Sequence, residues 1–217
     1  MKKVTALIPV RKGSLRVKNK NIKSFADSSL LEIKIKQLLS LGNRLKDIIV
    51  TSDCMDMIAV AKDLGVSTHV RDPYFAGSEA TNSEFFENLA DSLEGENFLY
   101  SPVTCPLIST ETYLDCLDEF ERCDNVVTVC PVKHHLWRDG KPYNYKIEDS
   151  PNSQDLPDIY QLTYGACLLS KKSMKKYKNI VTPNPTFKIL NEIESVDIDT
   201  EFDFMVAEHI YEKINSN

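Results

Sequence analysis

Five basic side chains stand within ten residues just after the apolar run Val4–Val10: Arg11, Lys12, Arg16, Lys18 and Lys20. Arg11 can hold phosphate oxygens through two parallel hydrogen bonds, and Lys20 supplies a point charge. Gly13 and Ser14 can present backbone N–H groups to an anion. The segment therefore predicts a phosphate-binding loop. By charge alone, a solvated basic loop is the alternative interpretation.

The two common glycine-rich nucleotide motifs are absent from this loop, because Gly13 is its sole glycine and the next one is Gly42. Neither G-x-x-x-x-G-K-[ST] nor G-x-G-x-x-G can be written there. This excludes a Walker loop and a dinucleotide fingerprint. A triphosphate carries enough negative charge to justify the number of cations.

A second charged group stands near the end of the chain, where Asp197 and Asp199 flank Ile198. If this segment is extended, both carboxylates face one way and Ile198 faces the core. Adjacent carboxylates repel each other, and a hard cation such as Mg²⁺ relieves the repulsion. The alternative is a strand end at which Asp199 helps to cap the last helix. Together with the basic loop, the D-x-D motif indicates phosphoryl or nucleotidyl transfer.

Two neighbouring histidines, His134 and His135, precede Trp137 and Arg138. Adjacent side chains of an extended strand face opposite ways, which disfavours a metal site built from both histidines. One of them can contact a polar ligand, while the other is structural.

Strand-like and helix-like patterns alternate along the chain, which indicates an α/β fold with a mostly parallel sheet and helices around it. Ligands of open α/β sheets bind at the carboxyl ends of the strands, so the basic loop is expected at the site. After Val4–Val10, the predicted strands are 48–52, 66–70, 97–100, 125–130, 159–169 and 195–199. Three of the predicted helices span 29–41, 82–93 and 110–120. Another is capped by Asp53 and ends near residue 64, and the last starts with a capping box of Thr200 and Asp203.

One domain is predicted for residues 1–217, because this length is typical of a single core. Residues 133–160 interrupt the α/β rhythm with Pro142, Pro151, Pro157 and the only tryptophan. They are expected to form an inserted arm or small lobe.

Composition excludes several classes of function. Hydrophobic residues make up 42% and charged residues 27%, as in globular proteins. Residues 1–46 carry a net charge of +10 and the remainder −16, and the total of −6 argues against nucleic-acid binding and for a local anion site. Without a ~20-residue apolar run or a signal-peptide cleavage site, the chain is expected to be cytoplasmic, without a membrane partner. The six cysteines form no C-x-x-C pair and are expected to stay reduced.

The stretch IPVRKGSLRVKNKNI resembles the opening signature of the CMP-N-acylneuraminate (sialic acid) synthetase family. Five further motifs follow in the family's order: VTSD, RDPYFAGSEAT, TCPL, VCPVKHH and VDIDTEFDFMVAE. The resemblance implies a cytidylyltransferase. It would join CMP from CTP to the anomeric hydroxyl of a nonulosonic (sialic-type) acid, release pyrophosphate and require Mg²⁺. It also implies a Rossmann-like fold with helices on both faces of the sheet, and a homodimer whose dimerisation arm residues 133–160 fit.

The same resemblance, with the charge arguments above, gives roles to single residues. The expected nucleotide-binding residues are Arg11, Gly13, Ser14, Arg16, Lys20, Asn21, Arg71, Ala80, Thr81 and Asn82. The expected metal ligands are Asp197 and Asp199, and the expected substrate-binding residues are Thr104, His134, His135 and Arg138. Arg11, Lys20 and Asp199 are expected to be catalytic.

The sugar-side motifs depart from the family pattern. The family's Q-P-T-S-P-L-R reads P-V-T-C-P-L-I, with Pro102 for Gln and Ile108 for Arg, and its R-P-N-G-A reads L-T-Y-G-A at 162–166. Leu15 replaces a lysine whose charge Arg16 can supply. The acceptor is therefore left open among N-acetylneuraminate, legionaminic- and pseudaminic-type acids and Kdn. Candidates for the general base are His135, a metal-bound hydroxide and the substrate itself.

Two other functions remain as alternatives. A nucleotide-sugar glycosyltransferase also uses D-x-D with a metal, but its motif typically follows a mid-chain strand and it releases no pyrophosphate. A catalytically silent subunit would bind CTP without turnover.

Overall fold

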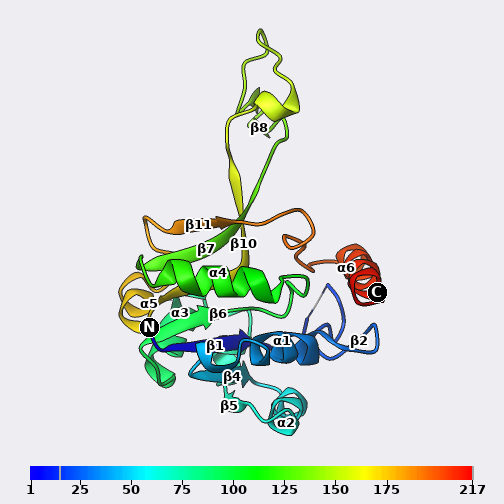
Figure 1. Ribbon diagram of the computed structural model, residues 1–217. Helices are drawn as coiled ribbons and strands as arrows, with labels where there is room; N and C mark the ends of the chain where they lie inside the picture. The colour runs from blue at the N-terminus through cyan, green and yellow to red at the C-terminus, as the bar shows by residue number, and fades with distance from the viewer. Residues whose placement is uncertain (15, 217) are drawn as a thin grey trace.

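The computed structural model describes residues 1–14 and 16–216. In it, the first apolar run forms β1 (Val4–Pro9), an inner strand of a seven-stranded sheet. The other strands of this sheet are β4 (Asp47–Ser52), β5 (Ser67–Val70), β6 (Asn97–Tyr100), β7 (Asn125–Pro131), β10 (Tyr160–Ser170) and β11 (Thr186–Ile189). Their order is β11-β7-β10-β6-β1-β4-β5 (Figure 1). Leu15 and Asn217 lie outside the described residues.

Most of the strand pairs are parallel, as the alternation of elements predicted. β1 pairs in parallel with β4 and β6, β4 with β5, and β7 with β11. β10 is antiparallel to both of its neighbours, β6 and β7. The carboxyl ends of β1, β4 and β6 therefore meet at one edge of the sheet, where the site is expected.

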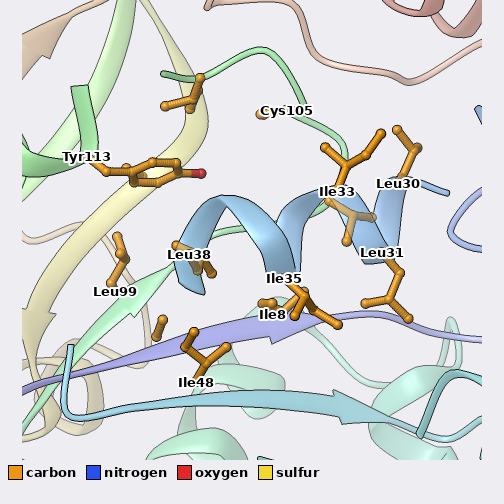
Figure 2. Packing of buried hydrophobic residues seen from close by; sticks show 14 of the residues in the cluster. Ile8, Leu30, Leu31, Ile33, Ile35, Leu38, Ile48, Leu99, Cys105 and Tyr113 are labelled. Carbon is orange, nitrogen blue, oxygen red and sulfur yellow. The ribbon is translucent and has the colours of Figure 1, made fainter. Parts of the chain in front are cut away.

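Helices cover both faces of the sheet, which confirms the predicted architecture. α1 (Leu30–Leu39), α2 (Met55–Asp63), α4 (Thr110–Phe120) and α6 (Glu201–Asn215) contribute to one core cluster (Figure 2). α3 (Asn82–Ser92) and α5 (Lys171–Tyr177) contribute to the other. β1 is buried on both sides because Ala6 and Ile8 enter the first cluster while Leu7 enters the second.

The basic loop leads into a small hairpin, β2 (Ser24–Phe25) and β3 (Ser28–Ser29), that is anchored on the last helix. Phe25 is fully buried, and its ring lies 5.2 Å from that of Phe204 and 5.6 Å from that of Tyr211. Burying a phenylalanine side chain contributes roughly 1.5–3 kcal/mol. Helix α1 then starts at Leu30, where Ser29 caps the backbone N–H of Glu32.

Residues 133–159 leave the sheet between β7 and β10 and project from it as an arm (Figure 1). The arm carries the two-stranded ladder β8 (Trp137–Arg138) and β9 (Lys141–Pro142). Within the described chain, none of residues 133–158 belongs to either core cluster. The remaining short elements are 3₁₀ turns at Gly42–Arg44, Pro73–Ala76 and Ser153–Asp155.

Several local expectations are wrong. The α2 cap is Cys54 rather than Asp53, because the Asp53 carboxylate accepts the backbone N–H of Lys12 instead. The segment 195–199 is the end of a turn followed by chain without regular secondary structure, and the structure assigns it to no strand. Strand β11 and helix α5 were not predicted.

All six cysteines are free thiols in the part of the chain that the structure describes. No helix in that part of the chain has the length and apolar character needed to cross a membrane.

Candidate active site

A cavity of about 410 Å³ opens at the carboxyl ends of β1 and β6. It is bounded by the basic loop, the segment after β5, the start of α3, the segment after β6, and the D-x-D motif. Its lining includes Arg11, Ser14, Arg16, Lys20, Asn21, Arg71, Phe75, Ala80, Asn82, Phe85, Tyr100, Pro102, Val103, Thr104, Tyr164, Asp197 and Asp199. The structure thus brings together most of the residues singled out from the sequence.

Hydrogen bonds fix the basic loop to its own backbone and to the opposite wall of the cavity. Arg11 Nη1 donates to the carbonyls of Ala76 (2.9 Å) and Gly77 (3.3 Å) across the cavity. Asn21 is buried, and its Nδ2 donates to the Arg11 carbonyl at 3.0 Å. Gly13 has a φ of +92°, which a residue with a side chain adopts only with strain, and it does not line the cavity.

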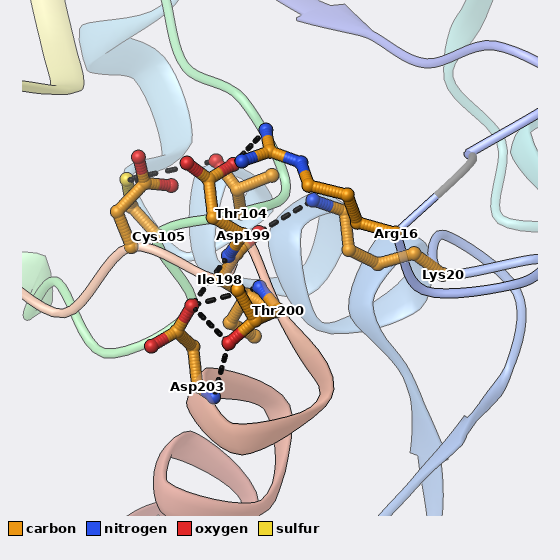
Figure 3. Close-up of polar contacts among 9 residues, drawn as sticks. Arg16, Lys20, Thr104, Cys105, Ile198, Asp199, Thr200 and Asp203 are labelled. Carbon is orange, nitrogen blue, oxygen red and sulfur yellow. Dashed lines mark hydrogen bonds and ion pairs between the residues drawn. The ribbon is translucent and has the colours of Figure 1, made fainter.

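The two carboxylates face the cavity while the residue between them is buried, as alternation along an extended segment predicted. Ile198 has no exposed surface, and its backbone N–H donates to the Thr104 carbonyl at 2.8 Å. The helix cap is made by Thr200 and Asp203, so the Asp199 carboxylate remains directed to the cavity (Figure 3).

Cations from the start of the chain contact the D-x-D segment directly (Figure 3). Arg16 Nη2 lies 2.7 Å from Asp199 Oδ1. Lys20 Nζ donates to the Ile198 carbonyl at 2.5 Å. These contacts join residues about 180 positions apart, so the basic loop and the D-x-D motif form two sides of one cavity.

Burial and charge act against each other at this junction. Burial lowers the pKa of Lys20, while the charges of Asp197 and Asp199 partly restore it. Burial also raises the pKa of Asp197, opposed by a hydrogen bond from Thr104, and the charge of Asp199 raises it further. An added cation or polyphosphate would therefore change the balance of charges in the cavity.

The neighbouring Cys105 thiol is unsuited to be a nucleophile. Burial, followed by the charge of Asp197, raises the pKa of Cys105 to about 12. Since the thiolate is the reactive form, this side chain stays a thiol at neutral pH.

Asp197 and Asp199 fit Mg²⁺ only if other oxygens complete its coordination. The described residues contain no group of three or more His, Cys, Asp and Glu side chains that could hold a metal. Mg²⁺ is commonly bound by one or two carboxylates together with substrate phosphates and waters. The donor set therefore fits a metal that is shared with a polyphosphate.

Arg71 forms the inner wall on the side of α3. Its side chain is only 3% exposed, its Nη2 donates to the Val10 carbonyl at 2.5 Å, and its guanidinium lies 5.1 Å from the centre of the Phe85 ring. Its Nε has no hydrogen-bond partner among the described residues. A buried donor without a partner costs roughly 1–3 kcal/mol, so a ligand acceptor at this wall would be stabilising.

The start of α3 contributes unequally. Ala80 and Asn82 line the cavity, whereas Thr81 does not. The Thr81 side chain caps the helix by accepting from the Glu84 backbone, in a reciprocal capping box.

Tyr164 is a cavity residue that the sequence did not single out. The pairing of β10 with β7 shifts register between Leu162 and Cys167, and Tyr164 lies in this bulge with a φ of +59°. A bulge re-aims a side chain, and here it brings the tyrosine to the cavity opposite the basic loop. In the sequence, the only indication of a role for Tyr164 was its position in the segment L-T-Y-G-A, which differs from the family's R-P-N-G-A.

His134, His135 and Arg138 do not reach this cavity, contrary to the expectation that they contact the substrate there. His135 Nε2 is 2.9 Å from the Pro151 carbonyl, and its ring packs against Tyr145. Arg138 lies over the ring of Tyr143. The physical reason is that β7 and β10 extend beyond the sheet and carry all three into the arm (Figure 1). His135 is therefore not placed as a general base in this chain's own cavity.

Comparisons with known proteins agree with this geometry. The sequence model of the family described as cytidylyltransferase matches residues 5–135. The chain is 24% identical to the pseudaminic acid cytidylyltransferase of Campylobacter jejuni, over 96% of both chains. It is also 24% identical to the N-acylneuraminate cytidylyltransferase of Streptococcus agalactiae, over 96% of this chain and 54% of that protein.

Similarity in three dimensions extends over the whole chain. A solved structure of CMP:2-keto-3-deoxy-manno-octonic acid synthetase in complex with CTP has a TM-score of 0.74 and 9% identity, covering 98% of this chain and 99% of that one. This likeness shows a shared fold. The family match and the relatives confirm the resemblance to sialic-acid-type cytidylyltransferases. The chain therefore belongs to the cytidylyltransferase family.

Proposed function

We propose that this protein transfers CMP from CTP to the anomeric hydroxyl of a nonulosonic acid and releases pyrophosphate. The observation that carries the proposal is the meeting of the basic loop with the D-x-D segment in one cavity, where Arg16 pairs with Asp199 and Lys20 donates to the Ile198 carbonyl. The names of these two relatives, which specify pseudaminic acid and N-acylneuraminate, support a nonulosonic acceptor.

The nucleotide would lie along the basic loop, with its base toward Arg71. The unpartnered Nε of Arg71, together with Asn82 and the Phe85 ring, offers a hydrogen-bonding and stacking environment for a cytosine. Arg11, Arg16 and Lys20 would bind the phosphates, with Ser14 and the Gly13 backbone at the turn. Phosphate oxygens accept charged hydrogen bonds more strongly than the carbonyls that Arg11 and Lys20 contact now.

Asp197 and Asp199 would hold Mg²⁺, which when bound neutralises phosphate charge and favours departure of pyrophosphate. Asp199 would exchange its ion pair with Arg16 for this role, leaving Arg16 free to bind phosphate. The anomeric oxygen attacks the α-phosphorus, the bond from that phosphorus to the bridging oxygen breaks so that pyrophosphate departs, and the hydroxyl proton passes to water. Alignment and charge neutralisation by the chain's own side chains contribute most of the rate.

The acceptor side favours a deoxygenated acid of pseudaminic type. Pro102, Val103, Thr104 and Tyr164 line this part of the cavity, and its polar side-chain groups are the two hydroxyls of Thr104 and Tyr164. Such a wall offers few hydrogen bonds to the hydroxyl-rich tail of N-acetylneuraminate, and buried polar groups without partners are costly. It suits an acid that carries methyl and amide groups instead.

A homodimer formed through the arm is part of the proposal. Trp137, Tyr143 and Ile147 are each more than half exposed on the arm. Clustered apolar side chains of this kind commonly mark contact surfaces.

The direct test is pyrophosphate release with CTP, Mg²⁺ and a panel of nonulosonic acids, with ATP, GTP and UTP as controls. Turnover is expected with CTP and is expected to be fastest with the pseudaminic-type acid. Lys20→Ala and Asp199→Ala are expected to lower kcat at least about a hundredfold, since each removes a charge that faces the reacting phosphates. Circular dichroism should show an unchanged fold in both variants.

The outcomes separate the rival functions. Release of a nucleoside mono- or diphosphate in place of pyrophosphate would identify a glycosyltransferase. Binding of CTP without turnover of any acid would identify a silent nucleotide-binding subunit. Full activity of either variant would remove that residue from the mechanism.

A further inference from the structure

Beneath the acceptor side of the cavity lies a chain of three buried polar side chains, Lys34, Tyr113 and Ser101 (Figure 2 shows α1 and Tyr113). Each of the three has no exposed surface. Lys34 Nζ is 2.7 Å from Tyr113 Oη, which is 2.6 Å from Ser101 Oγ. They come from α1, α4 and the end of β6, so the network joins three elements behind the cavity.

Both ends of this network terminate on backbone carbonyls of cavity segments. Lys34 Nζ donates to the Cys105 carbonyl at 2.8 Å, and Ser101 Oγ donates to the Gly165 carbonyl at 3.1 Å. Cys105 follows Thr104, whose carbonyl receives the Ile198 N–H of the D-x-D motif (Figure 3). Gly165 follows Tyr164. One network therefore holds two backbone segments that carry the cavity residues Thr104 and Tyr164, and these segments also touch directly where Cys105 Sγ donates to the Thr163 carbonyl.

Stability by itself does not account for a lysine in this position. Burying an amine is costly, and apolar side chains of similar volume are commonly neutral or stabilising replacements for buried ionic groups. Burial lowers the pKa of Lys34 to about 7. The neutral amine keeps two N–H donors, one for the Cys105 carbonyl and one for the Tyr113 hydroxyl. The Tyr113 hydroxyl can then donate to Ser101 Oγ, and the Ser101 hydroxyl donates to the Gly165 carbonyl. The network can thus be fully satisfied in a single arrangement.

On the nucleotide side, Arg11 and Arg71 are held by separate contacts. Arg11 is fixed on the Ala76 and Gly77 carbonyls, and Arg71 on the Val10 carbonyl. None of these contacts includes Lys34, Tyr113 or Ser101. Disturbing the network should therefore affect the two halves of the cavity differently.

We propose that Lys34, Tyr113 and Ser101 are positioning residues that set the spacing of Thr104 and Tyr164 around the acceptor acid. The inference rests on the proposed function, because it assigns the acceptor to this side of the cavity. Small misplacements of reacting groups are sufficient to slow an enzyme, since about 1 Å can cost on the order of a hundredfold.

The test compares Tyr113→Phe with the wild type. This change removes one hydroxyl and keeps the ring, so the fold is retained. We expect kcat/KM for the acceptor to fall between about ten- and a hundredfold. The Kd of CTP, measured by calorimetry without acceptor, should stay within about twofold of wild type, because its contacts are separate. Lys34→Met is expected to act in the same direction.

The matched control is Phe120→Leu, which alters another buried aromatic side chain of α4. Lys2 Nζ lies over the Phe120 ring and donates to the Phe120 carbonyl, which the substitution keeps. It should lower the melting temperature without changing the acceptor KM. A wild-type kcat/KM in Tyr113→Phe, or a parallel loss of CTP affinity, would overturn the inference. If Lys34→Met does not fold, Tyr113→Phe decides alone.

Amide hydrogen exchange separates this inference from the proposed function. Tyr113→Phe should speed exchange in residues 102–105 and 164–166 and leave the basic loop unchanged. If the wild type releases no pyrophosphate with any acid, the proposed function fails, and the exchange result still decides whether the network orders these two segments. Unchanged exchange there would overturn the inference even in an active enzyme.

Discussion

Lys34 shows how one buried group can make folding stability depend on pH. Burial lowers its pKa from 10.5 to about 7 in the folded protein. Between these values the unfolded chain binds a proton that the folded chain does not, so the stability contribution of Lys34 rises with pH. Below about pH 7 the folded protein carries the full cost of a buried ammonium.

We predict that the unfolding free energy of the wild type rises relative to that of Lys34→Met between pH 7 and 9. The slope should be on the order of 1 kcal/mol per pH unit. Urea unfolding at several pH values measures it. The difference in unfolding free energy between the wild type and Lys36→Met, which changes an exposed lysine of the same helix, should not vary with pH in this way. Parallel pH profiles for wild type and Lys34→Met would contradict the prediction.

Among the elements, β10 has the most specialised local structure. Its outer part pairs with β7, its inner part lies between β6 and β7, and the register shift between Leu162 and Cys167 separates them. Gly165 is required at this shift by close packing. A Cβ there would lie 2.1 Å from Ile108 Cδ1, and Ile108 is itself buried.

We therefore predict that Gly165→Ala lowers the unfolding free energy by roughly 1–3 kcal/mol, the usual cost of overpacking a core. Ile108→Val removes the clashing methyl group and alone should cost about 0.5–1.5 kcal/mol. The double variant should be less destabilised than the sum of the two, because the residues are in contact. Denaturant titration of all four proteins measures this coupling, and strict additivity would rule out the clash.

For the molecule as a whole, the arm is separable from the core. The N–H of Val132 donates to the Ile159 carbonyl at 2.8 Å, so the two ends of the arm lie side by side at the sheet. Among the described residues, the two core clusters contain no residue of the segment 133–158. A short connection across this point should leave the core intact.

Replacing residues 134–158 by a short Gly/Ser loop should preserve cooperative unfolding and the rise in melting temperature caused by CTP. Light scattering is expected to show a dimer for the full chain and a monomer for the shortened one. A monomeric full chain would contradict the proposed homodimer. Loss of cooperative unfolding in the shortened chain would show that the arm supports the core.

Periodicity predicted most elements because their apolar spacing reports burial directly. The helix expected at 110–120 is observed with those bounds, and α1 differs from its expected range by a few residues at its ends. β11 was missed because only four residues form it and two are half exposed. α5 was missed because six of its seven residues are lysine, serine or tyrosine that are exposed or partly exposed, and its one buried side chain, Met174, gives no periodicity.

The amino-acid sequence by itself determined the charge types of the site and the alternation that places Asp197 and Asp199 on one side of Ile198. Both follow from residue identity and near-neighbour geometry. Only the tertiary structure decided that Arg16 meets Asp199 across 183 positions, that Tyr164 is turned into the cavity, and that the paired histidines leave it. Such contacts depend on strand pairing and helix packing between distant segments, which no local pattern specifies.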